Sequence, residues 1–188
     1  MSTIKVNNIE NRTGSSITIG GSSTTSLDLA STITGGTLTN TPAWKVYDSA
    51  GQTGLAFNTY NTITFDTVDF DTNSGFNTGT SKYTVPTTGK YYINFQFGVT
   101  GASANLITIF GEVYNETTAK VLIRHREVTS TDQSSGGQAY VGNINGIVDL
   151  TASDSLYCRV YCFASSGTLT INYTEQYTFF SGCKLIGA

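Results

Sequence analysis

Apolar and polar residues alternate one by one along many short runs of this chain, most regularly between residues 91 and 97. The odd positions of this run are all large and apolar, whereas the even positions are Tyr92, Asn94 and Gln96. A period of two puts every second side chain on the same face of an extended strand. We find no run with the 3.6-residue period of an amphipathic helix. The alternation therefore predicts an all-β fold.

Eleven apolar runs beyond residue 42 are candidate strands, separated by stretches rich in Ser, Thr, Asn, Asp and Gly that favour turns. Short strands at this spacing are typical of a sandwich or jelly roll, and we expect a jelly-roll β-sandwich of about ten strands. The candidate strands are Ala43–Tyr47, Gly54–Phe57, Thr62–Phe65, Lys82–Val85, Lys90–Val99, Asn105–Tyr114, Lys120–Val128, Gln138–Leu150, Ser155–Ala164, Leu169–Tyr173 and Tyr177–Ile186.

Charge and hydropathy exclude several classes of partner. Only 12% of the residues are charged, the net charge is −3, and no basic cluster is present, which argues against nucleic acid or an anionic membrane. No run of about 18 apolar residues predicts a membrane-spanning helix. The first residues lack the apolar core of about 7–15 residues of a secretory signal, so we expect synthesis in a cytoplasm.

Composition changes near Pro42 and divides the chain. Ser, Thr, Gly and Asn make up 21 of the 29 residues of 13–41, which leaves too little apolar surface for this segment to fold alone. A repeat, Ser16–Gly21 echoed by Ser31–Gly36, favours a stalk in which three chains share a thin core. A flexible linker is the alternative. Residues 42–188 form the predicted knob domain.

Residues 1–12 are a third region, an N-terminal arm. Ile4 and Val6 alternate with polar residues and Ile9 follows, so these three are candidate anchoring residues. An alternating segment of this kind can add a strand to the sheet of another protein. A frayed terminus fits the pattern equally well.

Aromatic residues also occupy the expected outer faces of the strands. In the run 156–162 the even positions resemble a core, which leaves Tyr157 and Tyr161 on the opposite face. In the run 179–185 we expect Phe179 inside and Phe180 outside. If these strands share a sheet with Tyr92, its outer face is rich in aromatics and indicates a partner subunit; the alternative is an ordinary scatter of surface aromatics.

Residues with catalytic or metal-binding potential do not form a convincing site. Cys158 and Cys162 are about 13 Å apart along one strand, too far for a disulfide, and with Cys183 we expect reduced thiols. His125, the only histidine, has no predicted nucleophile and orienting acid beside it. Asp66, Asp69 and Asp71 resemble a calcium loop but lack a closing acid. We expect no enzyme activity, catalytic residue, metal or cofactor.

Four segments resemble the globular heads of complement subcomponent q and the tumour necrosis factor superfamily. Thr80–Phe95 is similar to their TGxFxxPxxGxYxFxF stretch, Tyr177–Gly182 to their closing TFSG strand, and Val148–Leu156 to their LxLxxGDxV segment, with Ser153 in place of Gly. Phe65-Asp66 and Asn73 extend the match, which covers about residues 42–188.

The resemblance implies a ten-strand jelly roll that assembles as a homotrimer. It also implies that Tyr92, Asn94, Gln96 and Phe180 face the neighbouring subunits. Together with the strand pattern, this gives the candidate trimer interface: Tyr92, Asn94, Gln96, Tyr157, Tyr161 and Phe180.

The first residues, MSTIKVNNIENRTGSSITIGG, are similar to the N-termini of structural proteins of tailed bacteriophages, cyanophages in particular. This resemblance implies a virion structural protein that docks on other virion proteins through its arm. We expect a trimeric tail-fibre knob for host attachment, with a host surface receptor or polysaccharide as its partner. Capsid decoration and a soluble lectin-like module are the alternatives.

Overall fold

The computed structural model describes residues 41–102, 106–128, 138–164, 166–172 and 177–185. The predicted arm (1–12) and nearly all of the predicted stalk (13–41) lie outside the described residues. The described strands all belong to one compact unit, Thr39–Ala188.

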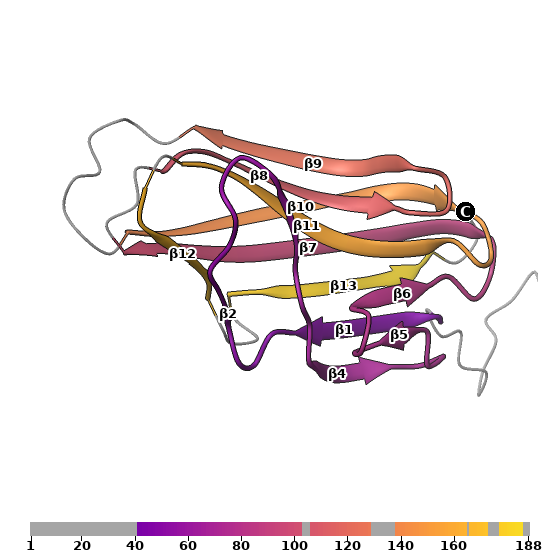
Figure 1. Cartoon of the computed structure of the whole chain (residues 1–188). Coiled ribbons are helices and arrows are strands. Elements are labelled where there is room, and N and C mark those ends of the chain that lie inside the picture. Colours follow the sequence, from indigo (N-terminus) through magenta and orange to yellow (C-terminus); the bar gives the residue numbers. More distant parts are fainter. Residues whose placement is uncertain (1–40, 103–105, 129–137, 165, 173–176, 186–188) are drawn as a thin grey trace, which may run out of the picture. The chain divides into compact units, whose positions relative to one another are not determined.

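Thirteen strands in the described part of the chain form two antiparallel sheets (Figure 1). Sheet 1 has the order β2-β12-β7-β13-β1-β4, and β10 pairs with the other edge of β7. Sheet 2 has the order β5-β6-β11-β8-β9, and β3 also pairs with β11. The strands are β1 (Ala43–Tyr47), β2 (Gln52–Thr53), β3 (Tyr60–Thr62), β4 (Thr67–Asp71), β5 (Phe76–Asn77), β6 (Lys82–Thr84), β7 (Gly89–Ala102), β8 (Leu106–Asn115), β9 (Lys120–Val128), β10 (Gln138–Leu150), β11 (Ser155–Ala164), β12 (Thr168–Ile171) and β13 (Phe179–Lys184).

The core lies between the two sheets and follows the predicted alternation on β7 and β11. The odd residues 91–97 of β7 and the even residues 156–164 of β11 are buried. Trp44 from β1 stacks on Tyr83 from β6, with 3.7 Å between the ring centroids. Burial of these large side chains on both sheets supplies the hydrophobic free energy that holds the sandwich together.

Two glycines leave room for Phe97 at the middle of this core. A Cβ at Gly111 on β8 would lie 2.0 Å from the Phe97 ring, and one at Gly142 on β10 would lie 2.4 Å from it. Both distances are far below van der Waals contact. The Phe97 ring therefore fills the space that side chains at these positions would need.

Several segments differ from the predicted strands. β2 and β5 were not predicted, and in place of the predicted Thr62–Phe65 the structure has β3, Tyr60–Thr62. Gly54–Phe57 is not a strand, because Gly54 has a φ of +72° and the amides of Gly54 and Leu55 both donate to the Leu169 carbonyl, which bends the chain. Thr67–Asp71 is a strand that was not predicted. It is an edge strand of sheet 1 with mostly exposed side chains, although its sequence alternates between the polar Thr67, Asp69 and Asp71 and the apolar Val68 and Phe70.

No helix is present in these described ranges, so none is available there to cross a membrane.

Candidate functional site

The aromatic face predicted from three strands is divided between two opposite sides of the sandwich. β7 and β13 belong to sheet 1, whereas β11 belongs to sheet 2. Tyr92, Asn94 and Gln96 therefore lie on the outer side of sheet 1, and Tyr157 and Tyr161 lie on the outer side of sheet 2. The expectation of one shared face was wrong because alternation shows which side of a strand is buried but not which sheet the strand joins.

Phe180 is a second correction, because its side chain is fully buried in the core. It pairs with Phe95 of β7 and packs edge-on against Trp44, with 5.4 Å between the ring centroids. The adjacent phenylalanines allow either face of β13 to be the inner one. The inner face is decided by Gly182, where a Cβ would lie 2.4 Å from the Trp44 ring. Phe179 therefore lies on the outer side.

The outer side of sheet 1 carries apolar side chains that no described residue covers. Ile147 on β10 is 64% exposed, and it stands opposite Tyr92, which is 38% exposed. The row continues through Cys183 on β13 to Ala43 on β1. Val141 on β10 and Phe70 on β4 are also exposed, at 50% and 47%. Apolar side chains thus extend across the width of this sheet.

Amide side chains occupy the middle of the same face. Asn143 donates to Gln96 at 3.3 Å, and Asn145 donates to Asn143 at 3.2 Å. The Oδ1 atom of Asn94 is buried and finds no hydrogen-bond donor among the described residues. A buried acceptor without a donor costs free energy.

The outer side of sheet 2 is built around Glu112 on β8, whose side chain is fully buried. Its carboxylate accepts hydrogen bonds from the Nε of Arg159 on β11 at 2.8 Å, from the hydroxyl of Tyr60 on β3 at 2.7 Å, and from Arg124 on β9. Four strands therefore meet at one carboxylate. Buried charges persist only when paired in this way.

The pKa values of the partners reflect this pairing. Burial raises the pKa of the Tyr60 phenol, and the hydrogen bond to Glu112 raises it further. Burial acts to lower the pKa of Arg159, but the hydrogen bond and the negative charge of Glu112 outweigh it, so the pKa lies above its ordinary value. Tyr60 therefore stays a hydrogen-bond donor and Arg159 stays a cation at neutral pH.

Aromatic rings hold the arginines in place. The Arg159 guanidinium lies between the rings of Tyr60 and Tyr114, at 4.0 Å from each centroid. Arg126 lies over the Phe110 ring at 5.5 Å. Cation–π contacts of this kind fix the orientation of a guanidinium.

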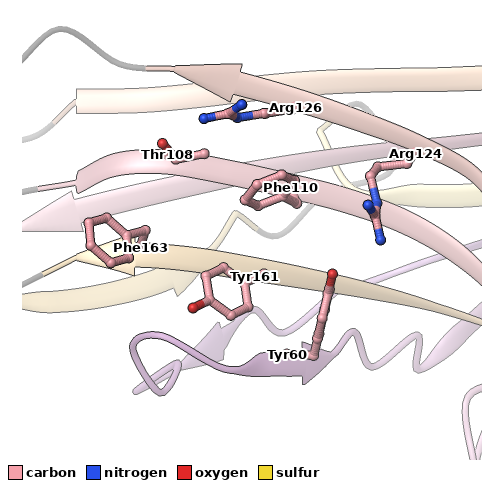
Figure 2. A pocket seen from close by; sticks show the side chains of 7 residues that line it. All are labelled: Tyr60, Thr108, Phe110, Arg124, Arg126, Tyr161 and Phe163. Carbon is pink, nitrogen blue, oxygen red and sulfur yellow. The ribbon is translucent and has the colours of Figure 1, made fainter.

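Beside this cluster, sheet 2 is hollowed. Figure 2 shows the hollow, which we call the arginine groove, with its side chains arising from β3, β8, β9 and β11. Its volume is about 580 Å³. It is lined by Tyr60, Thr108, Phe110, Arg124, Arg126, Tyr161 and Phe163. Sequence reasoning pointed to Tyr161 alone among these, since strand pairings across the chain bring the others together.

The candidate calcium loop is not a ligand set. Asp66 accepts hydrogen bonds from Ser49, Asp69 forms an ion pair with Lys45 at 3.0 Å, and Asp71 accepts from the Phe76 amide. Each carboxylate thus has its own partner. No cluster of three or more potential metal ligands occurs among the described residues.

The cysteines form no disulfide. Cys158 and Cys162 are buried on β11, and Cys183 is partly buried on β13. Burial raises the pKa of both β11 thiols, that of Cys162 to about 12. These thiols are therefore protonated and poor nucleophiles at neutral pH.

The fold is similar to that of tumour necrosis factor family proteins. The structure of the Eiger TNF from S. frugiperda matches with a TM-score of 0.58 and 14% identity, over 78% of this chain and 93% of that chain. Murine APRIL, solved at pH 8.0, matches with a TM-score of 0.55 and 14% identity, over 76% of this chain and 98% of that chain. No family model matches the sequence, and no curated protein matches it. The likeness supports a jelly-roll fold.

Proposed function

We propose that this chain is a non-enzymatic attachment module, a homotrimeric jelly-roll knob that assembles through the outer side of sheet 1. The observation that carries the proposal is the exposed apolar pair of Ile147 and Tyr92 on neighbouring strands of sheet 1. Beside it lies the Oδ1 atom of Asn94, which has no hydrogen-bond donor among the described residues. Exposed apolar patches of this kind are typical of subunit interfaces. The resemblance to complement q and tumour necrosis factor heads supports a trimer as the assembly.

The proposed trimer leaves sheet 2 open to solvent. Tyr92, Asn94, Gln96 and Phe179 face neighbouring subunits in this proposal, whereas Tyr157 and Tyr161 do not. The arginine groove then lies on the outside of the proposed trimer, where a ligand carried by a host surface can reach it. An attachment module needs one face that its own subunits cover, here sheet 1, and one face that a ligand can reach, here sheet 2.

Ile147→Asp tests the assembly. A charge buried at a subunit interface is unpaired and costly, so we expect the wild-type protein to be a trimer and this variant a monomer with an unchanged circular dichroism spectrum. Light scattering coupled to size exclusion measures both masses.

The matched control is Val121→Asp. Val121 is an exposed apolar residue, 37% accessible, on β9 of sheet 2. This variant remains trimeric if sheet 1 is the interface. The proposed assembly would be refuted if the wild-type protein were a monomer at micromolar concentration, or if the two variants changed the measured mass equally.

We further propose that the chain is a bacteriophage virion structural protein of the tail-fibre type. The similarity of the first residues to virion protein N-termini supports this, with Ile4, Val6 and Ile9 as the anchoring residues. Electron microscopy of particles labelled with an antibody against the knob tests it. Label at the tail supports a fibre, label across the shell supports capsid decoration, and unlabelled particles refute both.

A further inference from the structure

The arginine groove concentrates positive charge on a chain that is negative as a whole. The sequence contains four arginines, and Arg124, Arg126 and Arg159 all lie on this side of sheet 2. Arg124 and Arg159 pair with one carboxylate, Glu112, and Arg126 adds a third positive charge, so the local balance is three positive charges against one. The net charge of the chain is −3. An anionic group is therefore attracted to this one side in particular.

Arg126 is the arginine of the groove whose guanidinium N–H groups are not paired with a carboxylate among the described residues. Glu112 takes hydrogen bonds from Arg159 and Arg124. Arg126 contacts the face of Phe110, and no carboxylate pairs with it among the described residues. Figure 2 shows its guanidinium at the end of the groove where Thr108 and Phe163 lie. A planar guanidinium in this position can bind a carboxylate through two parallel hydrogen bonds.

Aromatic rings form the rest of the lining. Phe163 is 44% exposed and Tyr60 is 39% exposed, and the Tyr161 ring packs against Tyr60 with 5.2 Å between the centroids. Ring faces offer flat apolar surface, and the hydroxyls of Tyr60 and Tyr161 lie beside it. A ligand that fits this lining has flat apolar faces, hydroxyl groups and a carboxylate on the same unit.

The groove is built before any ligand arrives. Glu112 ties β3, β9 and β11 to β8, and the arginines are already stacked on their rings. Binding therefore costs little side-chain entropy. The net negative charge of the chain repels densely charged polyanions such as nucleic acids. A ligand with widely spaced carboxylates is repelled less and is therefore favoured.

We propose that the arginine groove binds acidic oligosaccharides, in which pyranose rings carry carboxylates. Arg126 binds the carboxylate, and Phe163 and Tyr161 stack on the sugar ring. The inference rests on the proposed attachment function, for which it names the ligand class. Acidic peptides and nucleic acids are alternative occupants that the test separates.

Isothermal titration of the full-length protein tests the ligand class. The probes are short oligomers of galacturonate, mannuronate and guluronate, together with a sialylated oligosaccharide. We expect at least one to bind with a Kd below about 1 mM. We expect binding to weaken when the carboxylates are methyl-esterified and when salt is raised. A glutamate peptide and a single-stranded oligonucleotide of similar charge are the competing probes.

Arg126→Gln is the diagnostic variant. It removes the bidentate donor and should weaken oligosaccharide binding about tenfold or more. Lys120→Gln is the matched control, since Lys120 is an exposed cation on the same strand, about 20 Å away at 3.3 Å per residue. It should leave the Kd unchanged.

Three results would overturn the inference: no binding of any acidic oligosaccharide, equal or tighter binding of the peptide or oligonucleotide, or equal losses in the two variants. Light scattering on the same samples keeps the two proposals apart. A wild-type trimer that binds no probe refutes the ligand class alone. A wild-type monomer that binds refutes the trimer alone.

Discussion

Ser153 lies in the turn between β10 and β11 with a φ of +73°, in the left-handed region that favours glycine. Its neighbours fix this turn. The Ser153 amide donates to the Val85 carbonyl at 2.8 Å, and the Thr151 amide donates to the Asp154 carboxylate at 2.9 Å. The heads that this segment resembles carry Gly at the position of Ser153. The backbone conformation gives the physical reason for that preference.

Ser153→Gly should therefore stabilise the protein. Glycine removes the strain of a left-handed residue but adds freedom to the unfolded chain, so we expect the free energy of unfolding to rise by about 0.5–1 kcal/mol. Urea unfolding measures the change, and Ser153→Ala, which keeps the strain, is the control. A loss of stability in the glycine variant would contradict the explanation.

At the scale of elements, β13 shows how one strand divides its side chains between two tasks. Phe180 points inward onto Trp44 and completes the core. Phe179 points outward and stands opposite Gln96 on the proposed interface. The two phenylalanines are adjacent in the sequence and chemically identical, so only their position on the strand distinguishes them.

The two phenylalanines should respond differently to truncation. In the Ile147→Asp background, where assembly is expected to be removed, Phe180→Ala should cost about 3–5 kcal/mol because it leaves a cavity in the core. Phe179→Ala should cost less than about 1 kcal/mol, since the side chain lies outside that core. Urea unfolding of the two variants provides the comparison, and equal losses would show that the inner face of β13 is wrongly assigned.

At the scale of the whole molecule, the sandwich has two outer sides of different chemistry. Sheet 1 has exposed apolar residues with amides among them, and sheet 2 has a buried carboxylate with arginines and aromatic rings around it. The first is suited to another copy of the chain and the second to a charged ligand. This division underlies both proposals.

The labelling rate of Cys183 measures whether neighbouring subunits cover sheet 1, because this cysteine lies beside Tyr92 on the outer side of the sheet. Iodoacetamide at neutral pH should label it slowly in the wild-type trimer and faster in Ile147→Asp. Cys158 and Cys162 should stay unlabelled in both, because burial keeps them protonated and inaccessible. Mass spectrometry of the intact chain measures the labelling, and equal rates at Cys183 would argue against a covered face.

The local alternation in the sequence was sufficient to predict an all-β sandwich and the buried sides of β7 and β11. It failed at β13, where two adjacent phenylalanines fit both phases, and the edge strand β4 was not predicted although its residues alternate. Local alternation could not predict the arginine groove, because the groove is formed by residues that are far apart in the sequence. Tyr60 and Arg159 meet Glu112 across 52 and 47 residues of sequence.

The sequence by itself determined which residues can form strands and which side of most strands is apolar, because the period of two is a property of the extended backbone. Only the tertiary structure decided which sheet each strand joins. That choice depends on how the apolar sides of distant strands pack together, and it separated Tyr92 from Tyr161 and brought Arg124 and Arg159 to one carboxylate.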